Sequence, residues 1–569
     1  MATPFSETWT ALRLFMAEAW RRVLLKRATL GTRLFYMGGS GPDHLIVAPS
    51  DLRLADPYAA AEICAGRFAL GGRAIDTGGA SIFEMNLGSG AVAHELHGFR
   101  WLRHLRAAEN EKASVDARAL VTDWIEIFGN RISGPAWQAD VLSCRIMSWL
   151  SHSPVLLRQA DHQFYFAFLR SLSLQLSHLR RIASLAPDGE VRLRVRVTLA
   201  MASLCLPSKS SAILANARNL DRELERQILA DGTHISRNPQ VIVDLLTDLL
   251  PLRQTYINLA HPMPDKLISS IDRMFVAIKF FRHSNGEIAL FNGATATPAE
   301  QLMTILRYDE TAGVPFRSMP NGHFQRLSAG ESVVLADTGS PPAGLLSAGT
   351  HAGCLSFEFS SGRQRIFVNG GAPFYPNEDY ERFARMTAAH STVVFDDTSS
   401  SRLSASHFLG PVVIGGVRRV SSEPINRADG SLGFSATHDG YLASAGVLHT
   451  RQIVMSADGR LISGVESFKR ADGRAVKAVK SRKRPQAVAR FHLHPRIHAI
   501  EAVTGQIRLS FRGAFEGGDE WLFISPDVTP TIEDDIFFAD MAGPRRSLQI
   551  CLHFALADHS EIGWYLRRV

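Results

Sequence analysis

Residues 351–392 read HAGCLSFEFSSGRQRIFVNGGAPFYPNEDYERFARMTAAHST, and apolar and polar side chains alternate near the start of this stretch. Leu355, Phe357 and Phe359 are apolar, whereas Ser356 and Glu358 between them are polar. A period of two residues is typical of a strand that is buried on one face. The pair Ser361-Gly362 predicts a turn, and the apolar residues 366–368 return as a second strand. The stretch therefore predicts a half-buried β-hairpin.

This hairpin would place polar side chains at the edge of a sheet. His351 precedes the first strand, and Asn369 ends the second one. The loop that follows carries Tyr375, Tyr380, Arg382, Arg385 and His390. Polar groups on a rigid sheet beside a long loop are typical of a functional site.

The chain on either side of residue 320 shows two different hydrophobic periods. Short alternating runs separated by turn residues occupy residues 331–336, 355–359, 365–368, 392–395, 412–416, 451–456, 487–493, 507–511, 521–525 and 547–554. They predict a large antiparallel β-sandwich. Upstream, apolar residues recur every three to four positions in residues 113–128, 139–151, 154–184, 191–206, 212–231, 239–260 and 265–283. This spacing predicts an all-α domain of antiparallel helical hairpins, with a domain boundary between residues 310 and 325.

The first 30 residues predict a basic amphipathic helix, because Arg21, Arg22 and Lys26 follow an apolar stretch rather than precede it. That order is not the order of a secretory signal peptide. Two interpretations stay open for this helix: it packs on the main domain, or it contacts a membrane surface.

Composition excludes several classes of protein. The 569 residues are 46% hydrophobic and 21% charged, which is typical of a soluble globular chain of two or three domains. No run of about 18 apolar residues predicts a membrane span. The five scattered cysteines form no CxxC pair, which argues against a disulfide framework. Together with the absence of a signal peptide, they predict a cytoplasmic protein.

The net charge of +7 suits an acidic partner. Nucleic acid is one such partner, but the densest basic run, residues 469–484, has no interleaved aromatic residues and predicts a solvated loop. The chain has no GxSxG or HExxH motif and no phosphate-binding loop. We therefore expect no nucleic-acid partner.

Three pieces of the opening stretch resemble the heparinase II/III-like family of polysaccharide lyases. They are His351-Ala352-Gly353, Asn369-Gly370-Gly371 and the "AAHNT"-type segment at residues 388–392. The resemblance implies an α+β multidomain protein with an incomplete (α/α) toroid followed by a large antiparallel β-sandwich. We predict an N-terminal helix and mixed segment at residues 1–110, the toroid at 111–315 and the sandwich at 316–569. In the family, a periplasmic or secreted location is common and is the alternative to the cytoplasm.

The resemblance also implies a structural zinc ion held by two histidines and an aspartate. Here the corresponding residues are His351, His390 and Asn369. A neutral amide is a poor zinc ligand, so the alternative is a hydrogen-bonded histidine pair that fixes the loop to the sheet. No other cofactor is expected.

For the chemistry, the resemblance implies β-elimination of a uronate-containing acidic glycan, such as a glycosaminoglycan or an alginate-like polymer, in the interdomain cleft. Elimination needs a group that neutralises the carboxylate, a base and an acid. The expected catalytic residues are His234, Asn238, Tyr256, Tyr375 and His390, and the expected substrate-binding residues are Arg237, Tyr380 and Arg385. Asn238 as a helix cap and Tyr256 as a core residue are the plain alternatives.

Two family histidines are missing from the sequence. The family's tyrosine-histidine pair after the proline is replaced by Val241 and Ile242, and Gly349 stands where the family has the first histidine of "HGHAD". Two functions are therefore open: a polysaccharide lyase, or a non-catalytic glycan-binding or cell-envelope regulatory protein that kept the lyase fold. The sequence predicts neither the glycan nor the oligomeric state.

Overall fold

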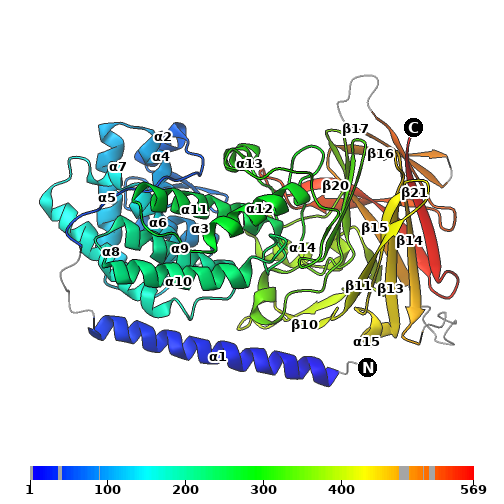
Figure 1. Cartoon of the computed structure of the whole chain (residues 1–569), viewed down its shortest axis with the longest axis horizontal. Coiled ribbons are helices and arrows are strands. Elements are labelled where there is room, and N and C mark those ends of the chain that lie inside the picture. Colours follow the sequence, from blue (N-terminus) through cyan, green and yellow to red (C-terminus); the bar gives the residue numbers. More distant parts are fainter. Residues whose placement is uncertain (1–3, 36–41, 89, 473–485, 504, 512–518) are drawn as a thin grey trace.

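A computed structural model describes residues 4–35, 42–88, 90–472, 486–503, 505–511 and 519–569. Most of the basic run at residues 469–484 lies outside these ranges. Two domains follow one another along the long axis of the molecule, helices first and strands second (Figure 1). No described helix has both the length and the apolar composition needed to cross a membrane.

The helical domain forms because each helix buries one apolar face against its neighbours in a common core. The helices after α1 are α2 (Pro57–Cys64), α3 (Ala91–Gly98), α4 (Leu102–Ala107), α5 (Glu111–Phe128), α6 (Ala139–Ser151), α7 (Ser153–Leu157), α8 (His162–Ile182), α9 (Glu190–Cys205), α10 (Ser210–Gln227), α11 (Pro239–Asn258), α12 (Leu267–Phe281) and α13 (Ala299–Leu306). A small hairpin of β1 (Arg67–Leu70) and β2 (Arg73–Asp76) precedes α3.

One expected helix is wrong in its extent. Residues 154–184 form two helices, because the chain turns at Gln159, which has a φ of 56°, and the Asp161 side chain then caps α8 by accepting from the Phe164 amide at 2.7 Å. The other expected helices agree with the structure to within a few residues at their ends.

The second domain is a sandwich of two antiparallel sheets. One sheet has the order β11-β12-β13-β14-β21-β18-β17-β16, formed by Val420–Asn426, Leu432–His438, Val447–Met455, Leu461–Arg470, Glu561–Arg568, Trp521–Ile524, Gln506–Phe511 and Ile497–Val503. The other has the order β19-β20-β15-β7-β6-β5-β4-β3, formed by Thr531–Phe537, Arg545–Ala555, Gln486–Leu493, Gln364–Val368, Phe357–Ser361, Ser332–Asp337, Phe324–Ala329 and Ser318–Met319. Strand β8 (Val393–Phe395) also pairs with β15, and β9 (Ser401–Leu403) pairs with β10 (Val413–Gly416).

The hairpin predicted from residues 355–368 is present as β6 and β7, but its burial differs from the expectation. Phe357 and Phe359 pack in the core between the two sheets. Glu358 and Ser360, on the opposite face, are also fully buried. The reason is that the helical domain covers this face: His283, just after α12, contacts both Glu358 and Ser360. The strand is buried on both faces.

Two further helices position the elements around the hairpin. The short helix α14 (Glu378–Ala384) follows β7 and lies between the two domains (Figure 1). The long helix α1 (Pro4–Phe35) runs along the outside of both domains. Its inner face contacts α8 of the helical domain and the β9–β10 hairpin of the sandwich.

Candidate functional site

The end of β7 is fastened to the helical domain by backbone contacts. The Ala372 amide donates to the Ala294 carbonyl at 2.9 Å, and the Thr295 hydroxyl donates to the Ala372 carbonyl at 2.7 Å. Farther along the loop, Tyr375 lies against the β1–β2 hairpin. A Cβ added at Gly72, whose φ is +75°, would lie 2.6 Å from Tyr375 Cγ, so only glycine permits this approach. The loop therefore closes one side of the domain junction.

Glu358 is the centre of a buried polar network at this junction. Its carboxylate accepts hydrogen bonds from His283 Nε2 at 2.7 Å, from Arg365 Nη2 at 2.8 Å, and from the Leu290 and Asn369 amides. Burial alone would raise the pKa of Glu358, but Arg365 and then His283 outweigh it and lower this pKa to about 2. Glu358 thus holds helical-domain groups on the sandwich. The sequence pattern placed Glu358 on the exposed face of a strand, so this role was missed. The available signal was an acidic residue between apolar residues of a strand, with Arg365 seven positions later on the paired strand.

His234 lies in the loop before α11 and is buried. Its Nδ1 accepts from the Ser236 amide at 3.1 Å, so the ring proton is on Nε2, which donates to Gln227 Oε1 at 2.9 Å. Burial lowers the pKa of His234 to about 4. Both ring nitrogens are occupied by the fold itself, which leaves no free lone pair for a substrate proton.

Arg237 crosses from the same loop to the sandwich. Its guanidinium donates to the carbonyls of Gly322, Ser340 and His323, forms a buried ion pair with Asp337, and lies 4.7 Å from the ring centre of Phe324. These contacts use four of its five N–H groups, so the expected two-point contact with a substrate carboxylate would have to replace at least one of them.

Asn238 is the N-cap of α11, since its Oδ1 accepts from the Gln240 amide at 2.8 Å. Tyr256 lies in the second half of the same helix within the helical core, fully buried, and burial raises its pKa to about 12. These environments match the alternatives stated for the two residues, a helix cap for Asn238 and a core residue for Tyr256. Tyr375 and Tyr380, by contrast, are 41% and 38% exposed.

Among the expected site residues, the structure brings together two histidines that were expected to hold a metal ion. His351 and His390 are in contact, with Nδ1 of the first 3.3 Å from Nε2 of the second. His234 and Arg237 lie on the loop before α11, and Tyr256 lies in the helical core. No bond joins these helical-domain residues to the histidine pair or to Tyr375 among the described contacts.

The residues expected to hold zinc do not fit the ion. His390 Nδ1 donates to the Met386 carbonyl at 2.8 Å, so its Nε2 is free to accept from His351 Nδ1. Asn369 already uses both ends of its amide: Oδ1 accepts from the Ser391 amide at 3.1 Å, and Nδ2 donates to Glu358 at 3.3 Å. Two imidazoles that satisfy each other and one neutral, occupied amide are a poor donor set for zinc.

One group of three potential ligands occurs among the described residues, formed by Glu533, Cys551 and His553 on strands β19 and β20. The pKa of Cys551 is raised to about 12, first by burial, which disfavours the thiolate that a metal would need.

We predict that Asn369→Asp destabilises the protein by about 2 kcal/mol, because it places a second carboxylate beside Glu358 and removes a hydrogen-bond donor. Urea unfolding with and without added zinc measures the effect. Zinc is expected to restore part of the stability of this variant and to leave the native chain unchanged. A native chain purified with stoichiometric zinc would contradict the interpretation of the histidine pair.

Acidification is expected to destabilise the protein through its buried histidines. The pKa of His234 and that of His390 are about 4 in the folded chain, against about 6.5 in an unfolded chain, so the unfolded state binds the proton more tightly. Their stabilising effect is complete above about pH 6.5 and is lost as the pH falls toward 4. The stabilisation by Glu358, whose pKa in the folded chain is about 2, is complete above about pH 4.3 and is lost only as the pH falls below that value. Near pH 5 each histidine should cost about 2 kcal/mol relative to neutral pH.

Urea unfolding at neutral pH and near pH 5 tests this expectation. His234→Gln should reduce the pH-dependent loss by about 2 kcal/mol. An identical loss in the native chain and the variant would show that His234 does not titrate as the structure indicates.

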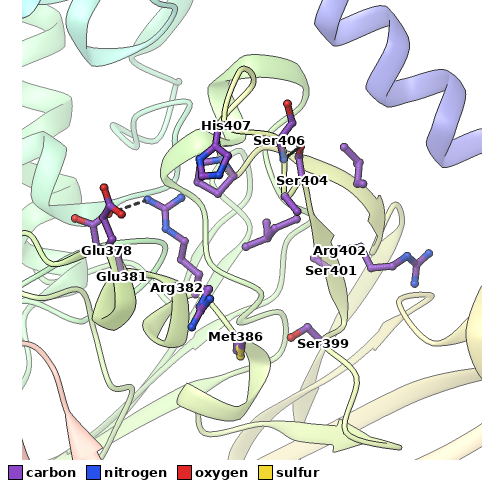
Figure 2. Close-up of a pocket in the computed structure, with 16 residues that line it drawn as sticks. Glu378, Glu381, Arg382, Met386, Ser399, Ser401, Arg402, Ser404, Ser406 and His407 are labelled. Carbon is purple, nitrogen blue, oxygen red and sulfur yellow. Dashed lines mark hydrogen bonds and ion pairs between the residues drawn. The ribbon is translucent and has the colours of Figure 1, made fainter.

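The junction between α14 and the β9–β10 hairpin contains a pocket of about 650 Å³ (Figure 2). Its lining combines the basic residues Arg382, Arg385, Arg402 and His407, four serines, two glutamates and the apolar residues Met386, Leu403 and Ile414, among others. Arg385 donates to the Ala348 carbonyl and lies 4.0 Å from Glu381. Figure 2 shows Arg402 turned away from the other lining residues, consistent with its ion pair to Glu7 of α1.

One lining residue has an unused polar group. The hydroxyl oxygen of Ser401 is buried and has no hydrogen-bond partner among the described atoms. Arg382 offers a charge at the mouth of the pocket, where its side chain is 65% exposed. The pocket therefore offers a cation and an unbonded hydroxyl group beside apolar side chains. Sequence reasoning missed residues 399–414 because they carry no motif.

Comparisons with known proteins bear on both domains. The family model described as "Heparinase II/III-like, C-terminal" matches residues 311–565. FtsZ-localized protein C from Caulobacter vibrioides is 29% identical over 522 residues, which cover 89% of each chain. Among solved structures, heparinase III superposes with a TM-score of 0.66 at 12% identity, covering 86% of this chain and 79% of that one.

A second solved structure, heparan sulfate lyase HepC from Pedobacter heparinus, gives a TM-score of 0.59 at 14% identity and covers 96% of this chain and 88% of that chain. At these identities the structures establish the fold. They confirm the expected helical toroid followed by an antiparallel β-sandwich.

Proposed function

Since residues 311–565 are a heparinase II/III-like C-terminal domain in a chain with the heparinase III fold, we propose that this protein is a non-catalytic member of that fold. In this proposal it acts as a regulatory binding protein that associates with FtsZ. The second function that the sequence left open is a non-catalytic glycan-binding or cell-envelope regulatory protein, and the proposal keeps its regulatory part and adds FtsZ as the partner. The proposal implies a cytoplasmic location, which is also the expectation from the sequence.

The observation that supports the proposal most is that His234 and Arg237, which were expected to act on a substrate, are hydrogen-bonded to other groups of the protein. His234 has both ring nitrogens hydrogen-bonded, one to Ser236 of its own loop and one to Gln227 at the end of α10, and Arg237 binds three carbonyls and Asp337. General base catalysis needs a lone pair within reach of the substrate proton, and neutralisation of a uronate needs an available cation. His234 is not available without breaking bonds inside the helical domain, and Arg237 is not available without breaking contacts that join the domains.

The similarity to FtsZ-localized protein C supports the partner. It extends over 89% of both chains at 29% identity, whereas the lyase structures are 12% to 14% identical. We propose that the pocket between α14 and the β9–β10 hairpin binds an acidic segment of the partner, with Arg382 and Arg385 contacting its carboxylates.

Co-precipitation with purified FtsZ tests this function. We expect the native chain to bind, and Arg382→Glu combined with Arg385→Glu to weaken binding at least about tenfold by charge reversal. Arg363→Glu combined with Arg546→Glu, an equal charge change at two exposed residues outside the pocket, is the matched control. Absence of FtsZ binding by the native chain would contradict the proposal. An equal loss of FtsZ binding in the control variant would show that the pocket is not the binding site.

A lyase remains the second candidate because one acid–base group lies near Asn238. Burial and the neighbouring Glu190 carboxylate raise the pKa of Asp244, on the same helix, to about 6. Such a carboxyl can exchange a proton near neutral pH. The substrate in that case would be an acidic uronate-containing glycan.

A further inference from the structure

Helix α1 is held against the protein along one face. Leu14 packs with Leu409 and Val412 of the sandwich, and Thr32 lies 3.1 Å from His178 of α8. Glu18 accepts hydrogen bonds from Arg21 and Arg22 at 2.7 Å. The helix is therefore fixed to both domains, and its opposite face has one orientation relative to the whole molecule.

The outward face of α1 is apolar. Six residues spaced three, four or seven positions apart, each between 44% and 64% exposed, form a single stripe: Trp9, Leu12, Met16, Trp20, Val23 and Leu30. At 1.5 Å per residue this stripe is about 32 Å long. Isolated exposed apolar residues are common on protein surfaces, but a continuous stripe with two tryptophans indicates a contact surface.

The charges around the stripe are of one sign. Arg13, Lys26 and Arg27 are exposed beside or within it. The acidic residues of the described part of the helix, Glu7 and Glu18, lie on the opposite side and form ion pairs with Arg402, Arg21 and Arg22. An apolar stripe bordered by basic residues is complementary to a surface that is apolar below and negatively charged above.

We propose that α1 is an interfacial helix that places the whole protein on an anionic lipid bilayer, with the stripe inserted among the acyl chains and the basic residues at the headgroups. The two tryptophans suit the boundary between headgroups and hydrocarbon, where an apolar ring with a polar N–H is favoured. No membrane-spanning segment is needed, because the helix lies in the plane of the surface.

The charge pattern favours a bilayer over a second copy of this chain. In a symmetric dimer through this face, Arg13, Lys26 and Arg27 of one copy would approach the same residues of the other. Like charges brought together at an interface oppose association, whereas anionic headgroups neutralise them.

Co-sedimentation of the full chain with vesicles of phosphatidylcholine and phosphatidylglycerol tests the proposal. We expect binding that weakens with salt and with removal of phosphatidylglycerol. Trp9→Glu with Trp20→Glu should lower partitioning at least about tenfold. Replacing Arg13, Lys26 and Arg27 by glutamine should lower it about fivefold per residue.

Val314→Glu with Phe316→Glu is the matched control, because both side chains are exposed but lie outside α1. This control should bind vesicles like the native chain, and thermal melts should show all variants folded, since none of the changed side chains is in the core. Equal partitioning of the tryptophan variant and the native chain would overturn the proposal. A native dimer that the tryptophan variant converts to monomer, without vesicle binding, would overturn it in favour of a second copy. Vesicle binding is independent of FtsZ binding, so either result can fail alone.

Discussion

Glu358→Gln is expected to lower the free energy of unfolding by about 3 to 5 kcal/mol. The carboxylate is completely buried and is the common acceptor for Arg365, His283 and two backbone amides. Removing one partner of a buried ion pair leaves the other charge without compensation in a medium that solvates it poorly. Glutamine preserves the volume of the side chain, so the loss reports the charge and its hydrogen bonds. Urea unfolding followed by circular dichroism measures it.

Glu287→Gln provides the matched control, because Glu287 pairs with the same arginine at 3.2 Å but its side chain is 53% exposed. An exposed pair contributes about 0.5 kcal/mol or less. If the two variants lost similar stability, the buried network around Glu358 would contribute no more than an exposed ion pair does.

Arg237→Met is expected to destabilise the protein by about 3 to 5 kcal/mol for a related reason. Methionine fills much of the space of the arginine stem, but it leaves buried Asp337 without its cation and three carbonyls without a donor. The same substitution distinguishes a structural arginine from one that binds substrate. A residue reserved for a substrate carboxylate would lose ligand binding and keep its stability.

Arg382→Met is the comparison for this variant, since its side chain is 65% exposed, pairs with Asp379 at 3.4 Å and lies 5.2 Å from the ring centre of Phe383, which is also exposed. We expect a change below about 0.5 kcal/mol. A stable Arg237→Met protein that had lost affinity for an acidic glycan would restore Arg237 to the substrate-binding role first expected for it.

Local patterns in the sequence were sufficient for most helices and strands because each pattern has a direct structural cause, whereas the toroid was implied by the family resemblance. The period-two run at residues 355–359 became β6, and Asn238 before Pro239 became the cap and first turn of α11. The exception at residues 154–184 has an equally local cause, the turn at Gln159. A helical period continues across such a turn, so periodicity alone does not reveal the break.

The site was predicted less completely because its contacts join residues far apart in the chain. Nothing near Glu358 in sequence indicates that His283 will reach it, 75 positions away, or that Arg237 will find Asp337 at a separation of 100. Residue type gave histidine, arginine and tyrosine as candidates for elimination chemistry. Only the fold reveals that His234 and Arg237 are already bonded.

The ultraviolet absorbance of unsaturated uronyl ends tests the central claim most directly, because β-elimination creates this chromophore and simple binding does not. The purified chain is incubated with heparan sulfate, alginate and bacterial glycuronans, with a known lyase as the positive control. We predict no increase in absorbance above the rate without protein. A sustained increase that disappears in Tyr375→Phe or Asp244→Asn would contradict the account and identify the protein as a lyase.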